Sequence, residues 1–182
     1  MAKIRPETQD SSFSLADFVA TINADLVNNI GNFVRRCVSL TNKFCDSKVE
    51  CTTIDIQTAQ FILRYCASMD QFKLRDALRV CLGLSSYGNL YLQTQQPREL
   101  TKKDTTEAKI VIGRAVMICR VLVILLSPFI PQTSQNILST AIKTKTDFRF
   151  DLDNDGVFSF ETNDTHSIPF KKVSIDEISS LV

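Results

Sequence analysis

The sequence predicts an all-α fold, an antiparallel helix bundle with a short irregular or hairpin C-terminal tail. Three observations indicate this. The 182 residues are 44% hydrophobic with only 5 glycines and 5 prolines, which suits one compact domain rich in helix. Apolar residues recur every three or four positions along most of the chain up to about residue 142. Beyond that point, phenylalanines alternate with polar residues around a turn at Asn154–Gly156.

The first helix is predicted from about residue 15 to residue 42. Ser14 is a suitable N-cap, and Asp17 is favoured by the helix dipole in the first turn. Apolar residues follow at helical spacing, namely Phe18, Ile22, Leu26, Ile30, Phe33, Cys37 and Leu40. The polar stretch CDSKVECTT, residues 45–53, is expected to form a loop.

Four further helices are predicted. The second covers residues 55–69, and its inward residues should be Ile56, Ala59, Ile62, Leu63 and Cys66. The third runs from about Phe72 to a point before Pro97, although two glycines weaken it by up to about 1 kcal/mol each. After a connector at residues 95–104, the fourth covers residues 106–126. The fifth begins at Pro131, which suits the first helical position, and ends near residue 142.

One stretch, IVIGRAVMICRVLVILLSPFI at residues 110–130, has the length of a membrane span. Arg114 and Arg120 lie inside it, and each would cost about 2.5–3.5 kcal/mol near a bilayer centre. Pro128 also interrupts it. A buried core helix is therefore predicted, with no membrane partner. The opening MAKIRPETQDSS lacks the apolar segment of a secretory signal, so we expect a cytoplasmic location.

Composition argues against several classes of function. Lys and Arg (21) nearly balance Asp and Glu (20), so any nucleic-acid role must depend on particular residues. Six dispersed cysteines and a single histidine favour free thiols over a zinc site. DLDNDG at residues 151–156 resembles a calcium loop, but its twelfth position is Thr162, so a hydrophilic turn is favoured. No catalytic or metal-binding residues are predicted.

The first helix carries a surface pattern that suits base recognition. On a helical wheel Asn28, Asn32 and Arg36 share one face, opposite the apolar residues, and form a stripe along the surface. Amides offer donors and an acceptor, and a guanidinium offers a planar fork of donors. Such groups can read the edges of unpaired bases, the usual mode of sequence-specific RNA recognition. The spacing alone favours the other interpretation, an ordinary solvated helix face.

The stretch NADLVNNIGNFVRR, residues 23–36, resembles the helix that opens the anticodon-binding domain of methionyl-tRNA synthetase, a class I enzyme. The similarity continues in order through RPETQDSSFSLADF, KLRDAL, GNLYLQTQQP, LLSPFIPQTSQNI and HSIPFKKVS. It covers nearly the whole chain and is closer to eukaryotic than to bacterial members. The resemblance implies residues 1–13 as a linker from a catalytic domain, 14–145 as the helical anticodon-binding domain and 146–182 as a C-terminal tail.

The resemblance also implies site residues. Asn28, Asn32 and Arg36 occupy the positions of the family's base-reading Asn, Asn and Arg, and Pro97 matches the proline of its Pro-Trp connector. Arg98 departs from the pattern, because the family has a Trp there that stacks on the first anticodon base. A guanidinium can still stack on a base, with less apolar contact area.

The implied function is recognition of the CAU anticodon of methionine tRNA. The family's Rossmann domain, which binds ATP, would lie upstream of the matched region, so we expect no cofactor and no methionine activation in this chain alone. Two alternatives stay open. A stand-alone helical scaffold that binds protein partners is favoured by Arg98 in place of Trp. The corresponding domain of the valine or isoleucine enzyme is disfavoured by the Asn-x3-Asn-x3-Arg stripe followed by YLQTQQP.

Overall fold

The computed structural model describes residues 14–51, 53–144, 158–162 and 170–179. The first helix is continuous through three segments, α1 (Leu15–Thr21), the π-helical segment η1 (Ile22–Gly31) and α2 (Asn32–Phe44). Ser14 caps it by accepting a hydrogen bond from the Asp17 backbone N–H (3.3 Å), as the sequence predicts. The π-helical middle was not predicted, because apolar spacing of three to four residues does not distinguish it from an α-helix.

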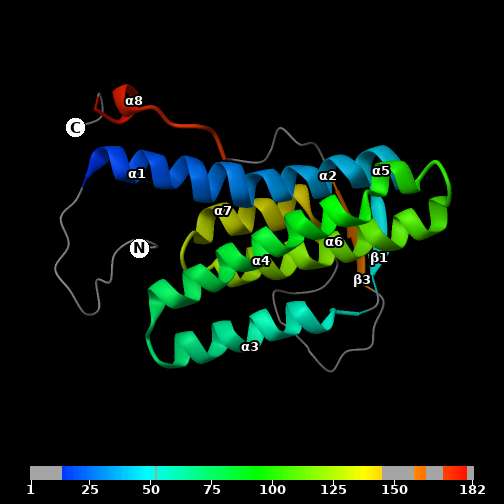
Figure 1. Ribbon diagram of the computed structural model, residues 1–182, viewed down its shortest axis with the longest axis horizontal. Helices are drawn as coiled ribbons and strands as arrows, with labels where there is room; N and C mark the ends of the chain where they lie inside the picture. The colour runs from blue at the N-terminus through cyan, green and yellow to red at the C-terminus, as the bar shows by residue number, and fades with distance from the viewer. Residues whose placement is uncertain (1–13, 52, 145–157, 163–169, 180–182) are drawn as a thin grey trace.

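The other predicted helices are all present (Figure 1). They are α3 (Ile56–Asp70), α4 (Leu74–Gln95), α6 (Thr105–Leu126) and α7 (Pro131–Asn136), which continues as η2 (Ile137–Ala141). Two short helices, α5 (Pro97–Leu100) and α8 (Ile175–Ser179), were not predicted. The first helix and α3 lie on opposite sides of the molecule, with α4 and α6 between them (Figure 1). The predicted all-α bundle is therefore confirmed.

Helix α6 forms the centre of the core. From Val111 to Leu126 every residue is buried except Arg114 and Ile124, which agrees with the predicted core helix. Arg120 is also buried, and its guanidinium lies 5.8 Å from the centre of the Phe160 ring. Burial lowers the pKa of this guanidinium. In the part of the chain that the structure describes, no helix has the combined length and apolarity needed to cross a membrane.

A small antiparallel sheet packs against α6, where Val49 and Glu50 lie beside Gly113. The strand order is β1 (Lys48–Cys51), β3 (Phe158–Glu161) and β2 (Lys143–Thr144), so β3 is central. The prediction of a loop over residues 45–53 was therefore wrong for β1. Its strand conformation depends on pairing with residues more than 100 positions later, as in the pair Val49–Phe160. The predicted turn at 154–156, the calcium-like stretch and the single histidine, His166, lie outside the described residues.

Helix α3 is rotated relative to the prediction. Its buried residues are Thr58, Ile62 and Tyr65, whereas Ile56 and Leu63 are 77% and 64% exposed. Cys66, also predicted to face inward, is exposed. The sequence offers two apolar faces on this helix, and only one can contact α4. A hydrogen bond contributes to the choice, because the N-cap residue of α3, Asp55, accepts from the Tyr87 hydroxyl of α4 (3.0 Å).

Helix α4 approaches the first helix closely at Gly88. A Cβ at this position would lie 2.2 Å from Cζ of the fully buried Phe33 ring, far inside van der Waals contact. The glycine that weakens α4 as an isolated helix is therefore required by packing. The close approach brings the next residue, Asn89, against the exposed side of the first helix.

Candidate nucleic-acid interface

The three residues of the predicted stripe lie on the outer face of the first helix. Asn28 belongs to η1 and Asn32 begins α2, and both side chains are exposed, while Arg36 is half-buried. A π-helical turn holds more residues than an α-helical turn, so side chains four apart no longer stack directly within it. Asn28 is consequently less aligned with the other two than an ideal wheel indicates. Asn32 and Arg36, both within α2, keep the expected alignment.

Asn89 of α4 connects Asn32 and Arg36. Its side-chain oxygen accepts hydrogen bonds from Asn32 Nδ2 (3.2 Å) and Arg36 Nη1 (3.1 Å), and its backbone oxygen also accepts from Arg36 Nη1 (3.1 Å). The Asn89 amide nitrogen donates to the backbone oxygens of Asn29 (3.1 Å) and Ser85 (3.2 Å). The side chain is thus held from both helices, and it fixes the orientation of two stripe residues.

A neighbouring amide strengthens the contact between the two helices. Asn29 donates from Nδ2 to the Leu82 backbone oxygen (3.2 Å) and to Ser86 Oγ (3.1 Å). Asn29 therefore faces α4, while Asn28 faces outward. The two adjacent asparagines therefore have different roles. Asn29 contributes to helix packing, and Asn28 is exposed to a ligand. Sequence periodicity alone does not separate these two roles.

Pro97 and Arg98 lie beside Arg36 at the end of α4. Gln96 adopts a left-handed conformation (φ 44°, ψ 55°), which ends α4 and begins α5 at Pro97. Pro97 is buried and Arg98 is exposed. A hollow of about 480 Å³ lies between α2 and this bend, within the range of small-ligand sites, ~300–1,000 Å³. It is lined by Arg36, Leu40, Leu92, Gln93, Gln96, Pro97, Arg98 and Glu99.

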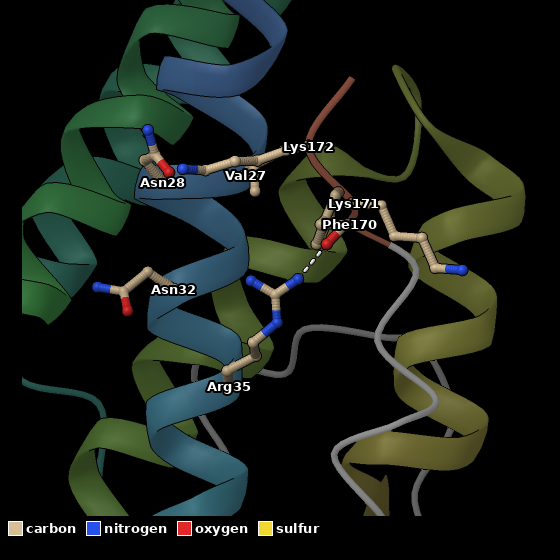
Figure 2. Close-up of a pocket in the computed structure, with 7 residues that line it drawn as sticks. All are labelled: Val27, Asn28, Asn32, Arg35, Phe170, Lys171 and Lys172. Atoms are coloured by element: carbon tan, nitrogen blue, oxygen red, sulfur yellow. Dashed lines mark hydrogen bonds between the residues drawn. The ribbon is translucent and has the colours of Figure 1, made fainter. Parts of the chain in front are cut away.

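A second hollow lies at the other end of the stripe (Figure 2). Its volume is about 410 Å³, and its lining residues are Val27, Asn28, Asn32, Arg35, Phe170, Lys171 and Lys172. Three of these are basic and none is acidic. In the first hollow the one carboxylate, Glu99, is paired with Lys102 (2.8 Å), which lowers the pKa of that carboxyl group. The interface therefore presents amides and cations, which suit binding to RNA bases and phosphates.

All five predicted site residues thus line one of these two hollows, but several other residues of the candidate interface were not predicted. Asn89, Arg35 and Lys172 were not predicted as part of the site. Asn89 lies within GNLYLQTQQP and Lys172 within HSIPFKKVS, two stretches that carry the family resemblance. Their contribution depends on the packing of α4 and of the C-terminal segment on the first helix, which a single sequence does not reveal.

Comparison with known proteins identifies the family. Residues 47–178 match the model of the anticodon binding domain of methionyl tRNA ligase. The chain belongs to this family. Residues 1–38, which include the stripe, match the model of the methionine group of class I tRNA synthetases. The anticodon-binding fold of the methionyl-tRNA ligases therefore accounts for the bundle, and the family resemblance seen in the sequence is confirmed.

Methionine–tRNA ligases of several organisms are similar to the chain. The one from Acanthamoeba polyphaga mimivirus is 36% identical over an alignment of 192 positions, covering all of this chain and 32% of the relative. The cytoplasmic enzyme of Xenopus laevis is 36% identical over 144 residues, 74% of this chain and 16% of the relative. The Pyrococcus abyssi enzyme is 34% identical over 145 residues, 75% of this chain and 20% of the relative. The chain spans a third or less of these relatives.

A solved structure agrees with the assignment. The apo form of Mycobacterium tuberculosis methionyl-tRNA synthetase superposes with a TM-score of 0.61 and 25% identity. The superposition covers 71% of this chain and 29% of the mycobacterial chain. The helical bundle is therefore shared with a methionyl-tRNA synthetase, and the chain again corresponds to a minor part of the longer protein.

Proposed function

We propose that this domain reads the CAU anticodon of methionine tRNA within a methionine–tRNA ligase. The observation that carries the proposal is the network in which Asn89 orients Asn32 and Arg36 on an exposed helix face. Among the described residues, the Asn32 side-chain oxygen Oδ1 and Arg36 Nη2 have no hydrogen-bond partner. These groups are therefore available to the edges of unpaired bases.

Each stripe residue has a distinct part in this proposal. Asn32, fixed by its bond to Asn89, offers an acceptor to the central base. Arg36 offers donors at the mouth of the hollow that it shares with Pro97 and Arg98, where Arg98 stacks its guanidinium on a base in place of an aromatic ring. Asn28 offers its amide to a base at the opposite end of the stripe, in the hollow that is also lined by Lys172.

The activity of the whole protein follows as a proposal from the same assignment. The parent enzyme would join methionine to its tRNA in the cytoplasm with ATP, and a Rossmann domain would hold the nucleotide. The present domain would contribute binding energy that separates cognate from noncognate tRNA. This chain by itself is not expected to catalyse ATP–pyrophosphate exchange, because the family's ATP-binding motifs belong to the Rossmann domain, upstream of the region that this chain resembles.

The test compares Asn32→Ala with wild type on two RNA stem-loops, one with a CAU anticodon and one with a changed anticodon. Asn32 is exposed, and Ala is the better helix former, so the fold should tolerate the change. Affinity for the CAU stem-loop should fall by about 1–3 kcal/mol, because a base's polar group loses its partner. Equal binding of both stem-loops by both proteins would overturn the proposal and favour a protein-interaction scaffold.

A further inference from the structure

The C-terminal segment (residues 170–173) is bound to the first helix by specific contacts. Asn23 pairs with the backbone of Val173 in both directions, donating from Nδ2 (2.8 Å) and accepting at Oδ1 (3.0 Å). Arg35 donates to the Phe170 backbone oxygen. The Phe170 side chain is buried over Gly31, where an added Cβ would lie 3.0 Å from Phe170 Cβ. These contacts hold both ends of a four-residue segment on the helix.

Two exposed lysines lie between those fixed ends. Lys171 and Lys172 both line the hollow beside Asn28 and Asn32, but their side chains point in opposite directions (Figure 2). Lys172 extends across the first helix toward Asn28, whereas Lys171 points away from it (Figure 2). Neither ammonium forms an ion pair with a carboxylate of the described residues. Lys172 is therefore a cation placed beside the stripe, and no carboxylate of the described part of the chain pairs with it.

A base held on the stripe is attached to a backbone whose phosphates then lie near the helix surface. Phosphate contacts supply much of the affinity of protein–nucleic acid complexes and fix their register, while base contacts supply specificity. The chain as a whole has a net charge of only +1, so electrostatic attraction must come from cations near the stripe. Lys172 has the position and the chemistry for this, because its ammonium is a compact point charge on a flexible stem.

We propose that Lys172 binds a backbone phosphate of the RNA whose bases lie on the stripe. Asn23 is the positioning residue that holds Lys172 there through Val173. The proposal rests on the proposed function, since it requires RNA at the stripe. It adds a contact that is independent of base identity, made by a part of the chain some 140 residues from Asn28.

The test measures affinity for an isolated anticodon stem-loop at several salt concentrations. Lys172→Ala should weaken binding by about two- to fivefold at low salt, equally for CAU and changed anticodons. It should also reduce the slope of log K against log salt by about 0.7–1. Lys171→Ala is the matched control, the same change one residue away on a side chain pointing elsewhere, and it should change neither quantity by a comparable amount.

A second set of variants tests the positioning role. Asn23→Ala should release the Val173 end of the segment and weaken binding, with a loss of salt slope similar to that of Lys172→Ala. In an Asn23→Ala/Lys172→Ala double variant the losses should not add, because Asn23 acts through Lys172. Additive losses would overturn the positioning role.

The outcomes separate this inference from the proposed function. If wild type prefers the CAU stem-loop and Asn32→Ala removes that preference, while Lys172→Ala behaves like Lys171→Ala, the phosphate contact alone is refuted. If wild type shows no preference for CAU, the proposed function fails. If wild type binds neither stem-loop, both proposals fall.

Discussion

Replacement of Asn89 by Ala tests whether recognition depends on a residue that need not touch RNA. Asn89 accepts from Asn32 and Arg36 and donates to two backbone oxygens, so the change removes about four hydrogen bonds. The side chain is only half-buried, so water replaces part of this network. At about 0.5–1.5 kcal/mol per net bond, and with up to about 0.7 kcal/mol returned by the better helix former, we expect a loss of about 1–2 kcal/mol in unfolding free energy.

The effect on RNA binding should be of similar size and of different origin. Without Asn89, the Asn32 and Arg36 side chains must be ordered when RNA binds. Immobilising each such side chain costs about 0.5–1.5 kcal/mol, which gives about 1–3 kcal/mol for the pair, or roughly 5- to 150-fold in affinity. Fluorescence anisotropy with a labelled CAU stem-loop measures this, and urea titration measures the stability separately.

Two further variants make the result decisive. Ser86→Ala removes a contact to Asn29 one turn earlier on α4 and leaves Asn32 and Arg36 untouched, so it should bind RNA as wild type does. In an Asn89→Ala/Arg36→Ala double variant the loss should be smaller than the sum of the two single losses, because part of the Asn89 effect acts through Arg36 and the rest through Asn32. Wild-type affinity in Asn89→Ala, or full additivity with Arg36→Ala, would refute the reasoning.

Two predictions concern stability. Gly88→Ala should destabilise the fold by about 1–3 kcal/mol in urea titration, because its Cβ would lie 2.2 Å from Phe33. Gly83→Ala on the same helix, whose Cβ would meet the Phe61 ring at 3.1 Å, should be much closer to neutral, and equal losses would contradict the packing argument. Burial raises the pKa of Cys81, and burial together with the bond to Asp55 raises the pKa of Tyr87, each to about 12. The unfolded chain therefore ionises at lower pH than the folded one, so unfolding free energy should be fully present below about pH 8.5 and fall as pH approaches 12. Urea unfolding midpoints measured at pH 7 and pH 10 under reductant check this prediction. Cys81→Ala should reduce the difference between the two midpoints. Equal midpoints at both pH values would show that ionisation of the buried thiol and phenol does not govern the stability in this range.

The helices could be predicted from the sequence because their signals are local. Ser14, Pro131 and the periodic apolar residues specify starts, ends and an inward face within short stretches of chain. The rotation of α3 could not be predicted, since Ile56 and Leu63 form as plausible an apolar face as Ile62 and Tyr65. The choice depends on contacts with α4, which only the packed bundle determines.

The candidate site was predictable to a similar degree. Asn28, Asn32 and Arg36 are recognisable from spacing and resemblance, because they lie on one helix. Asn89 and Lys172 are 57 and 140 positions from Asn32 in the chain, and their place at the site follows from a close helix contact and a docked segment. Strand β1 could not be predicted for the same reason, since the strand that it pairs with, β3, is distant in sequence.

The central position of β3 has a consequence for dividing this protein experimentally. β1 and β2 each pair with β3 and not with each other, so a fragment that stops at the end of the helices loses the strand that joins them. Such a fragment would expose two unpaired strand edges, which promote aggregation, and it would be destabilised by the cavity left by the Phe160 ring. The shortest soluble fragment of the bundle should therefore include residues 158–162. A fragment without them should aggregate and could not be used in an RNA-binding assay.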